Sequence, residues 1–274
     1  MKNLLPFLFL VLLFACQTES SESTQESVTY DTIRTGTGLQ YYYLKKGEGR
    51  QIKDGSLVAA YNRLYLNDID TVFWASEDNE DSTFSFIQGK TSLIKGALEL
   101  YPLLREGDEL VAIIPDSLGY GKEDNRGLPG GSTLVFNPII IRSVSAPKEM
   151  LSDTLIATVE NGSVEDVMDV YQSIASSELK DNYHMGLEHI RALFTSLEEP
   201  KRFSEIEELA IAFEAIAEDN TEKQGFRYSK VNAALSLLDT TKAVGYLNEI
   251  IEQDPEESFW KDMLERIASP PNQE

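Results

Sequence analysis

The sequence predicts an α+β protein in which an antiparallel sheet around a short helix is followed by an all-α domain. Residues 30–145 hold short runs of β-branched and aromatic residues separated by glycine turns, a pattern typical of antiparallel strands. From residue 146 onwards the apolar residues recur every three to four positions, as they do on one face of a helix. The 274 residues suit two modest domains, each of them large enough to bury a core.

The two parts of the chain differ in charge, and this charge excludes some classes of function. The chain carries a net charge of −22, and residues 146–274 hold 27 acidic but only 11 basic residues. Such an acidic surface offers no basic patch to displace phosphate counterions, so we expect no nucleic acid partner. With 42% hydrophobic residues and a single cysteine, the composition also excludes a disordered chain and a disulfide-stabilised scaffold.

The N-terminal segment has the features of an export signal. Lys2 precedes an apolar stretch over residues 4–15, which is too short to span a bilayer as a mature helix. The stretch closes with Leu13-Phe14-Ala15-Cys16, which resembles the lipobox of bacterial lipoproteins and contains the only cysteine. We therefore expect residues 1–15 to be a signal peptide and Cys16 to be lipidated. The alternative is an ordinary secretory signal with an accidental cysteine.

A tether is expected to follow the lipid. Residues 17–29 are rich in Ser, Thr and Glu and hold one apolar residue, so they cannot bury enough surface to fold. Residues 16–29 would thus join a lipid anchor to the folded body, in the bacterial cell envelope. The lack of Asp after Cys16 resembles the sorting signal of outer-membrane lipoproteins. The scattered glutamates resemble an export signal of surface lipoproteins only weakly, and the face of the membrane stays open.

Five strands and one helix are predicted in the first domain, residues 30–145. The strands cover residues 40–45, 56–66, 83–88, 109–114 and 133–142, because these runs alternate or are rich in β-branched and aromatic residues. Turn signals such as Asp54-Gly55 and Pro129-Gly130 stand between them. Residues 93–101 break the pattern with apolar residues at 93, 94, 97, 98, 100 and 101, which predicts a short helix packed on the sheet.

Eight short motifs of this domain stand in a characteristic order. They are Lys46-Gly47-Glu48-Gly49, Lys53-Asp54-Gly55, Val72-Phe73, Phe84-Ser85-Phe86, Leu93-Ile94-Lys95-Gly96, Arg105-Glu106-Gly107-Asp108, Ile114-Pro115-Asp116-Ser117-Leu118-Gly119-Tyr120-Gly121 and Leu128-Pro129-Gly130-Gly131-Ser132-Thr133-Leu134-Val135-Phe136. In order and spacing they resemble the FKBP-type peptidyl-prolyl isomerases, over about residues 36–145. The resemblance implies an FKBP-like curled antiparallel sheet around a short helix.

The resemblance also implies an apolar substrate pocket without a cofactor or a metal. Transferred position by position, its catalytic residues are Tyr61, Phe73, Ile94, Tyr120 and Phe136. Its substrate-binding residues are Phe84, Phe86, Leu93, Leu128, Ala97 and Trp74. In the family, the hydroxyl at the Tyr120 position and the backbone N–H at the Ile94 position donate hydrogen bonds to substrate carbonyls. The alternative for each aromatic residue is that it fills the core, most of all Phe86 and Phe136 and least of all Tyr120.

Two positions depart from the family pattern. Trp74 stands where an acidic residue is usual, and Ala97 stands where a tryptophan usually forms the pocket floor. Our hypothesis is that the Trp74 indole refills the space that Ala97 leaves. Alternatively, Trp74 lies on the surface and the domain binds chains without efficient catalysis.

Two features could suggest a metal but do not favour one. The acidic run over residues 77–81 lacks the glycine and the distal glutamate of an EF-hand loop, so a solvated loop is favoured. His184 and His189 are five residues apart, on different faces of a helix. We expect them to be exposed or capping histidines.

The second domain, residues 146–274, is predicted to be helical. Ser163 and Asp166 form an N-cap pair at the start of one helix, and apolar stripes continue through residues 187–197 and 206–217. Further helices are predicted at residues 222–238, 241–253 and 256–268. Residues 242–255 resemble the second helix and closing turn of a tetratricopeptide repeat, without a clean match at that period. A degenerate helical repeat and a plain helical bundle both remain open.

These features predict a membrane-tethered isomerase. It would isomerise or hold proline-containing segments of exported proteins, while the acidic helical domain docks an envelope protein or widens the client surface. Two alternatives remain. A pure binding module would bind prolyl peptides without catalysis, and a structural subunit of an outer-membrane assembly would do neither.

Overall fold

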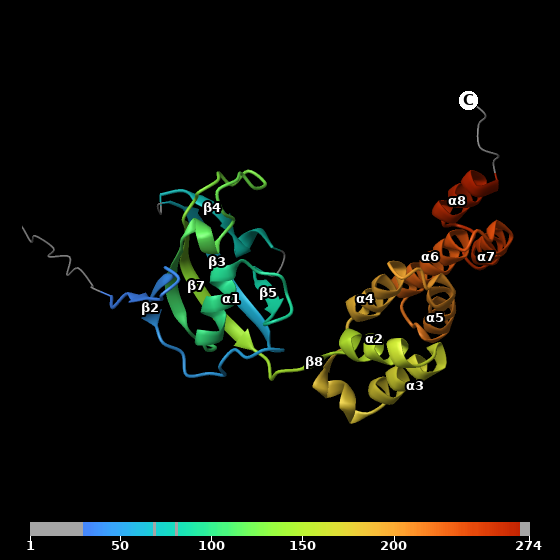
Figure 1. The fold of residues 1–274 in the computed structure, drawn as a ribbon, viewed down its shortest axis with the longest axis horizontal. Helices are drawn as coiled ribbons and strands as arrows, with labels where there is room; N and C mark the ends of the chain where they lie inside the picture. The colour runs from blue at the N-terminus through green and yellow to red at the C-terminus, as the bar shows by residue number, and fades with distance from the viewer. Residues whose placement is uncertain (1–29, 68–69, 80–81, 269–274) are drawn as a thin grey trace, which may run out of the picture.

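The computed structural model describes residues 30–67, 70–79 and 82–268. The predicted signal peptide, Cys16 and the tether lie outside these residues. Within them, no helix combines the length and the hydropathy needed to cross a membrane. The predicted α+β class is confirmed, because a sheet packed on a short helix is followed by a run of helices (Figure 1).

In the described part of the first domain, seven strands form the antiparallel sheet. They are β1 (Ile33–Arg34), β2 (Gln40–Lys45), β3 (Leu57–Leu66), β4 (Val72–Ala75), β5 (Phe84–Ile87), β6 (Glu109–Ile114) and β7 (Leu134–Val144). Their order is β1-β2-β6-β7-β3-β4, with β5 also paired to β3. All five predicted strands are present, while the short strands β1 and β4 were missed.

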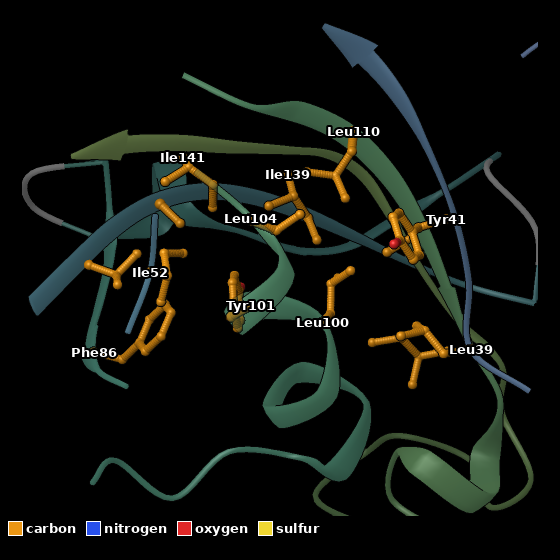
Figure 2. Packing of buried hydrophobic residues seen from close by; sticks show 14 of the residues in the cluster. Leu39, Tyr41, Ile52, Phe86, Leu100, Tyr101, Leu104, Leu110, Ile139 and Ile141 are labelled. Atoms are coloured by element: carbon orange, nitrogen blue, oxygen red, sulfur yellow. The ribbon is translucent and has the colours of Figure 1, made fainter. Parts of the chain in front are cut away.

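The predicted short helix is α1 (Lys95–Leu100), continued by a 3-10 turn over Tyr101–Leu103. Leu100, Tyr101 and Leu104 are buried against the concave face of the sheet, together with Ile139 of β7 (Figure 2). Burial of this apolar area is the main term that holds helix and sheet together.

Gly96 lets α1 approach the sheet closely. A Cβ atom at this position would lie 2.5 Å from Cγ2 of Ile114, a fully buried residue of β6. Carbon atoms in normal contact are about 3.5–4.0 Å apart. The helix can therefore sit at its observed depth only with glycine at position 96.

Seven α-helices follow within residues 146–268, the described part of the second domain. They are α2 (Leu151–Asn161), α3 (Val164–Ala175), α4 (Leu187–Glu198), α5 (Phe203–Ile216), α6 (Asn220–Ser236), α7 (Thr240–Gln253) and α8 (Ser258–Ala268). The predicted cap of α3 is confirmed, because the Ser163 hydroxyl accepts a hydrogen bond from Asp166 N and the Asp166 carboxylate accepts one from Ser163 N. The helix α2 had not been singled out in the sequence.

Ion pairs join the helices inside this domain. Glu214 of α5 accepts hydrogen bonds from Arg227 at 2.8 Å and from Lys230 at 2.6 Å, both on α6, and these three side chains are mostly buried. Glu207 of α5 likewise accepts from Lys242 and Tyr246 of α7, at 2.8 and 2.7 Å. Part of the acidic charge of the domain is thus neutralised internally.

The two parts of the chain meet at Gly55. Its carbonyl accepts a hydrogen bond from Lys148 N at 3.0 Å and lies 2.8 Å from Nε2 of His184. His184 belongs to β9 (Tyr183–His184), which pairs in parallel with β8 (Glu149–Met150) just after the link between the domains. His184 is half-buried in this contact, so its role is structural.

His189 corrects the expectation of an exposed histidine. It is only 2% exposed, and its Nδ1 lies 3.2 Å from the Ser152 hydroxyl. Burial lowers the pKa of His189, against the nearby carboxylate of Glu188, which raises it. The residue lies on the buried side of α4, as its neighbours Ile190 and Leu193 do.

Candidate functional site

The candidate site is a cavity of about 710 Å³ in the sheet domain, a size typical of pockets for small ligands. It lies between α1, the strands β3, β4, β5 and β7, and the loop over residues 115–131. Its lining residues are Asn62, Leu64, Phe73, Trp74, Phe84, Ser92, Leu93, Ile94, Ala97, Tyr101, Tyr120, Asn125, Arg126, Leu128 and Phe136. Most of these side chains are apolar or aromatic, and Arg126 is the one charged residue among them.

The structure brings most of the sequence-predicted site residues together at this cavity. The residues that line it are Phe73, Trp74, Phe84, Leu93, Ile94, Ala97, Tyr120, Leu128 and Phe136. They come from the strands β4, β5 and β7, from α1, from the segment just before α1 and from the loop over residues 115–131. Only the fold makes them neighbours. Phe86 does not line the cavity, because it is a core residue that is 2% exposed and packs on Tyr101 at 4.5 Å between ring centroids.

Tyr61 is a correction, because it does not line the cavity either. Side chains alternate between the two faces of a strand, and on β3 the buried positions include Ala60, Asn62 and Leu64. Tyr61 therefore points to the opposite face, where its hydroxyl donates to Glu77 at 2.6 Å. Glu77, which belongs to the acidic run, also pairs with Arg63. The strand phase of the apolar residues on β3 could have shown this from the sequence.

Asn62 takes the place in the cavity that was expected for Tyr61. It is 2% exposed, and its Nδ2 donates a hydrogen bond of 3.3 Å to the hydroxyl of Tyr101. Tyr101 follows α1 and is 4% exposed. Burial raises the pKa of Tyr101 to about 12, so its hydroxyl stays neutral near pH 7. Neither residue was identified from the sequence.

Trp74 lies in the wall of the cavity, and the surface alternative for it is wrong. It is half-buried, packs on the core of the sheet domain and meets Phe84 edge-on at 6.1 Å between ring centroids. Trp74, Ala97 and Tyr101 line the same cavity. Whether the Trp74 indole fills the space beside Ala97 stays a hypothesis, because both residues line the cavity but no contact between them is observed.

Two hydrogen-bond donors are available at the cavity. Tyr120 lines the cavity and is 47% exposed, and its hydroxyl has no hydrogen-bond partner among the residues that the structure describes. Ile94 is the N-cap of α1, and the backbone N–H groups at a helix start have no partner within the helix. The two donors can therefore hold carbonyl oxygens of an extended ligand.

The loop that carries Tyr120 is fixed by hydrogen bonds of its own. Lys122 forms an ion pair with Asp116, which lowers the pKa of Asp116. The N–H of Gly131 donates to the carbonyl of Gly121 at 2.8 Å, and Asn125 and Leu128 form a short antiparallel bridge. These contacts hold the Tyr120 side chain at the mouth of the cavity.

Two smaller cavities lie in the helical domain. They measure about 420 and 340 Å³ and share Tyr228 and Asn232 of α6. Within the described residues, no group of three or more His, Cys, Asp or Glu side chains is placed to hold a metal ion.

Comparison with known proteins finds similarity in the sheet domain. Residues 48–138 match the model of the FKBP-type peptidyl-prolyl cis-trans isomerases. A probable isomerase of this type from Neisseria meningitidis, FkpA, is 33% identical over 129 residues, which cover 45% of this chain and 44% of that protein. FkpA of Escherichia coli is 29% identical over 117 residues, which cover 42% and 41% respectively.

Other similar proteins match a similar share of the chain. The human peptidyl-prolyl isomerase FKBP14 is 29% identical over 100 residues, or 36% of this chain and 47% of that protein. The crystal structure of FkpA from Escherichia coli aligns over 42% of this chain and 51% of that chain, with a TM-score of 0.38. The chain therefore spans less than half the length of the curated relatives it matches.

Proposed function

We propose that this protein is a peptidyl-prolyl cis-trans isomerase for exported proteins of the bacterial cell envelope, with residues 48–138 as its FKBP-type domain. The observation that carries the proposal is the cavity. It joins an apolar and aromatic lining to the free hydroxyl of Tyr120 and the N–H of Ile94.

The chemistry of the reaction fits such a cavity. Rotation about the X–Pro bond is opposed by the partial double-bond character of the amide, with a barrier of about 18–20 kcal/mol. A dry site disfavours the polar planar form relative to the twisted form, in which the amide resonance is broken. Hydrogen bonds from Tyr120 and Ile94 to the carbonyls on either side would hold the twisted form. Binding the twisted form more tightly than the planar form is what accelerates the rotation.

The cellular role follows from the slowness of the uncatalysed step. X–Pro isomerisation takes tens to hundreds of seconds and limits the folding of many chains. A protein held at a membrane through a lipid on Cys16 would meet exported chains as they emerge. We place it in the envelope, with the outer membrane as the expected location.

The helical domain would supply a second contact. Residues 146–274 carry 27 acidic and 11 basic residues, which disfavours direct contact with anionic lipid headgroups. We propose that this domain docks an envelope protein partner or widens the surface that receives the client.

The second candidate is a binding module with weak catalysis. Trp74 and Ala97 favour it, because the family pattern has an acidic residue and a tryptophan at these positions. Such a module would bind prolyl peptides with little acceleration of their isomerisation. A structural role in an outer-membrane assembly would require neither the binding of prolyl peptides nor their isomerisation.

The experiment that tests the proposal measures isomerisation of a proline-containing peptide by the chain from residue 17 onwards. Removal of the hydroxyl in Tyr120→Phe takes away one hydrogen bond to the twisted form, so we expect a rate about five- to tenfold lower. The matched control is Tyr61→Phe, which removes a hydroxyl bound to Glu77 outside the cavity and should leave the rate unchanged. If the unsubstituted protein isomerises the peptide no faster than the uncatalysed background, the isomerase function is rejected. The binding-module function then remains.

A further inference from the structure

An unpaired polar atom lies in the wall of the apolar cavity. The Oδ1 atom of Asn62 is fully buried and has no hydrogen-bond partner within the described residues, although the residue lines the cavity. Buried acceptors are nearly always paired, because an unpaired one has lost its hydrogen bond to water. An exception that borders a ligand cavity indicates a group that is paired by the ligand.

The neighbouring hydroxyl of Tyr101 does not pair with Asn62 Oδ1. Asn62 Nδ2 donates to Tyr101 at 3.3 Å, so the amide and the hydroxyl share one hydrogen bond. An asparagine side chain has an acceptor end and a donor end. Once one end is used by Tyr101, the other end lacks a partner among the described residues. In the observed orientation that end is the acceptor Oδ1.

Proline cannot supply the missing donor. It has no backbone N–H and its side chain is a hydrocarbon ring. The donor must therefore come from a residue beside the proline. The residue before it shares the amide bond that rotates, so its side chain stays at the cavity throughout the reaction. A cavity of about 710 Å³ has room for more than one small ring.

We propose that Asn62 is a specificity-determining residue that selects segments in which a residue with a side-chain donor, such as threonine, precedes the proline. Asn62 Oδ1 accepts the hydrogen bond from that side chain, and the buried acceptor becomes paired. An apolar side chain at the same place would leave Oδ1 unpaired and desolvated. The inference rests on the proposed isomerase function and names its substrate class.

The test compares two peptides that differ in one group, Ala-Thr-Pro-Phe and Ala-Val-Pro-Phe. Threonine and valine have nearly the same shape, so the difference reports the hydroxyl. We expect kcat/KM to favour the threonine peptide by about five- to tenfold, which is the effect of one hydrogen bond to a buried group. Equal values for the two peptides would overturn the inference and leave the isomerase function intact.

Two variants identify the group that reads the hydroxyl. Asn62→Leu removes the acceptor, so the ratio of kcat/KM for the threonine and valine peptides should fall to about one. Tyr101→Phe keeps Asn62 Oδ1 in place and should retain the preference. Loss of the preference in Tyr101→Phe, together with its retention in Asn62→Leu, would assign the selection to the Tyr101 hydroxyl and overturn the role of Asn62.

Binding separates a failure of this inference from a failure of the proposed function. Trp74 lines the cavity, so its emission in a Trp260→Phe background reports the affinity of each peptide for the protein. If neither peptide is isomerised, the isomerase function fails, and tighter binding of the threonine peptide still supports the role of Asn62. Equal binding of both peptides would then overturn that role as well.

Discussion

Replacement of Gly96 by alanine is expected to destabilise the sheet domain. The new Cβ atom would lie 2.5 Å from Cγ2, 3.1 Å from Cδ1 and 3.3 Å from Cγ1 of Ile114. Ile114 is fully buried on β6, so its side chain has no free space to enter. Because normal carbon contacts are about 3.5–4.0 Å, α1 must move away from the sheet by roughly 1 Å.

The size of the effect follows from two opposing terms. Overpacking a well-packed core by one methyl group costs about 1–3 kcal/mol. Alanine is the better helix former and returns about 0.5–1 kcal/mol relative to glycine. The net loss of unfolding free energy should be about 1–2 kcal/mol. Because Ala97 lies on α1 and Ile94 is its N-cap, the same shift should weaken binding of prolyl peptides.

The assay is urea unfolding followed by tryptophan emission. The chain has two tryptophans, so Trp260→Phe leaves Trp74 as a reporter of the sheet domain. The matched control is Gly225→Ala in α6, where the added Cβ would meet nothing within 4 Å. With Trp260 as the reporter in a Trp74→Phe background, this control should stabilise the helical domain by about 0.5–1 kcal/mol.

A double-mutant cycle with Ile114→Ala isolates the clash. Alanine at position 114 removes the atoms that the new Cβ would meet, so Gly96→Ala should cost less in that background than in the unsubstituted protein. Additive losses would show that the destabilisation does not arise from this contact. A neutral or stabilising Gly96→Ala would refute the reasoning as a whole.

Two further predictions concern the helical domain. Glu214→Ala leaves Arg227 and Lys230 without their carboxylate partner, although their side chains are only 9% and 10% exposed. Urea unfolding should therefore show a loss of about 3 kcal/mol in the free energy of unfolding. The control Glu208→Ala, on the surface, should lose less than about 0.5 kcal/mol. Burial lowers the pKa of His189 below its ordinary 6.5. On acidification the unfolded chain therefore binds a proton at this histidine at a higher pH than the folded chain does. The free energy of unfolding should fall as the pH drops below about 6.5. Thermal unfolding between about pH 7.5 and 5 should show this decline, and a His189→Gln variant with an unchanged slope would contradict the assignment.

The fold class and most of the candidate site could be predicted from the sequence. The strand runs, the helix over residues 93–101 and the cap at Ser163 depend on local patterns, and local patterns are visible in one chain. Phe73, Trp74 and Tyr120 could be assigned to a pocket because their motifs stand in a family order. The face of a strand is also local information, so the assignment of Tyr61 could have been avoided from the alternation on β3.

The sequence by itself determined the two-part organisation, since the hydrophobic period changes from strand-like to helical near residue 146 and the acidic residues follow the same division. Only the tertiary structure decided that Asn62 and Tyr101 meet at one cavity and that His189 is buried. Those outcomes depend on how α1 packs against β3 and how α4 packs against α2. Contacts between segments far apart in the chain have no local signature, because they are set by the packing of whole elements rather than by the neighbours in sequence.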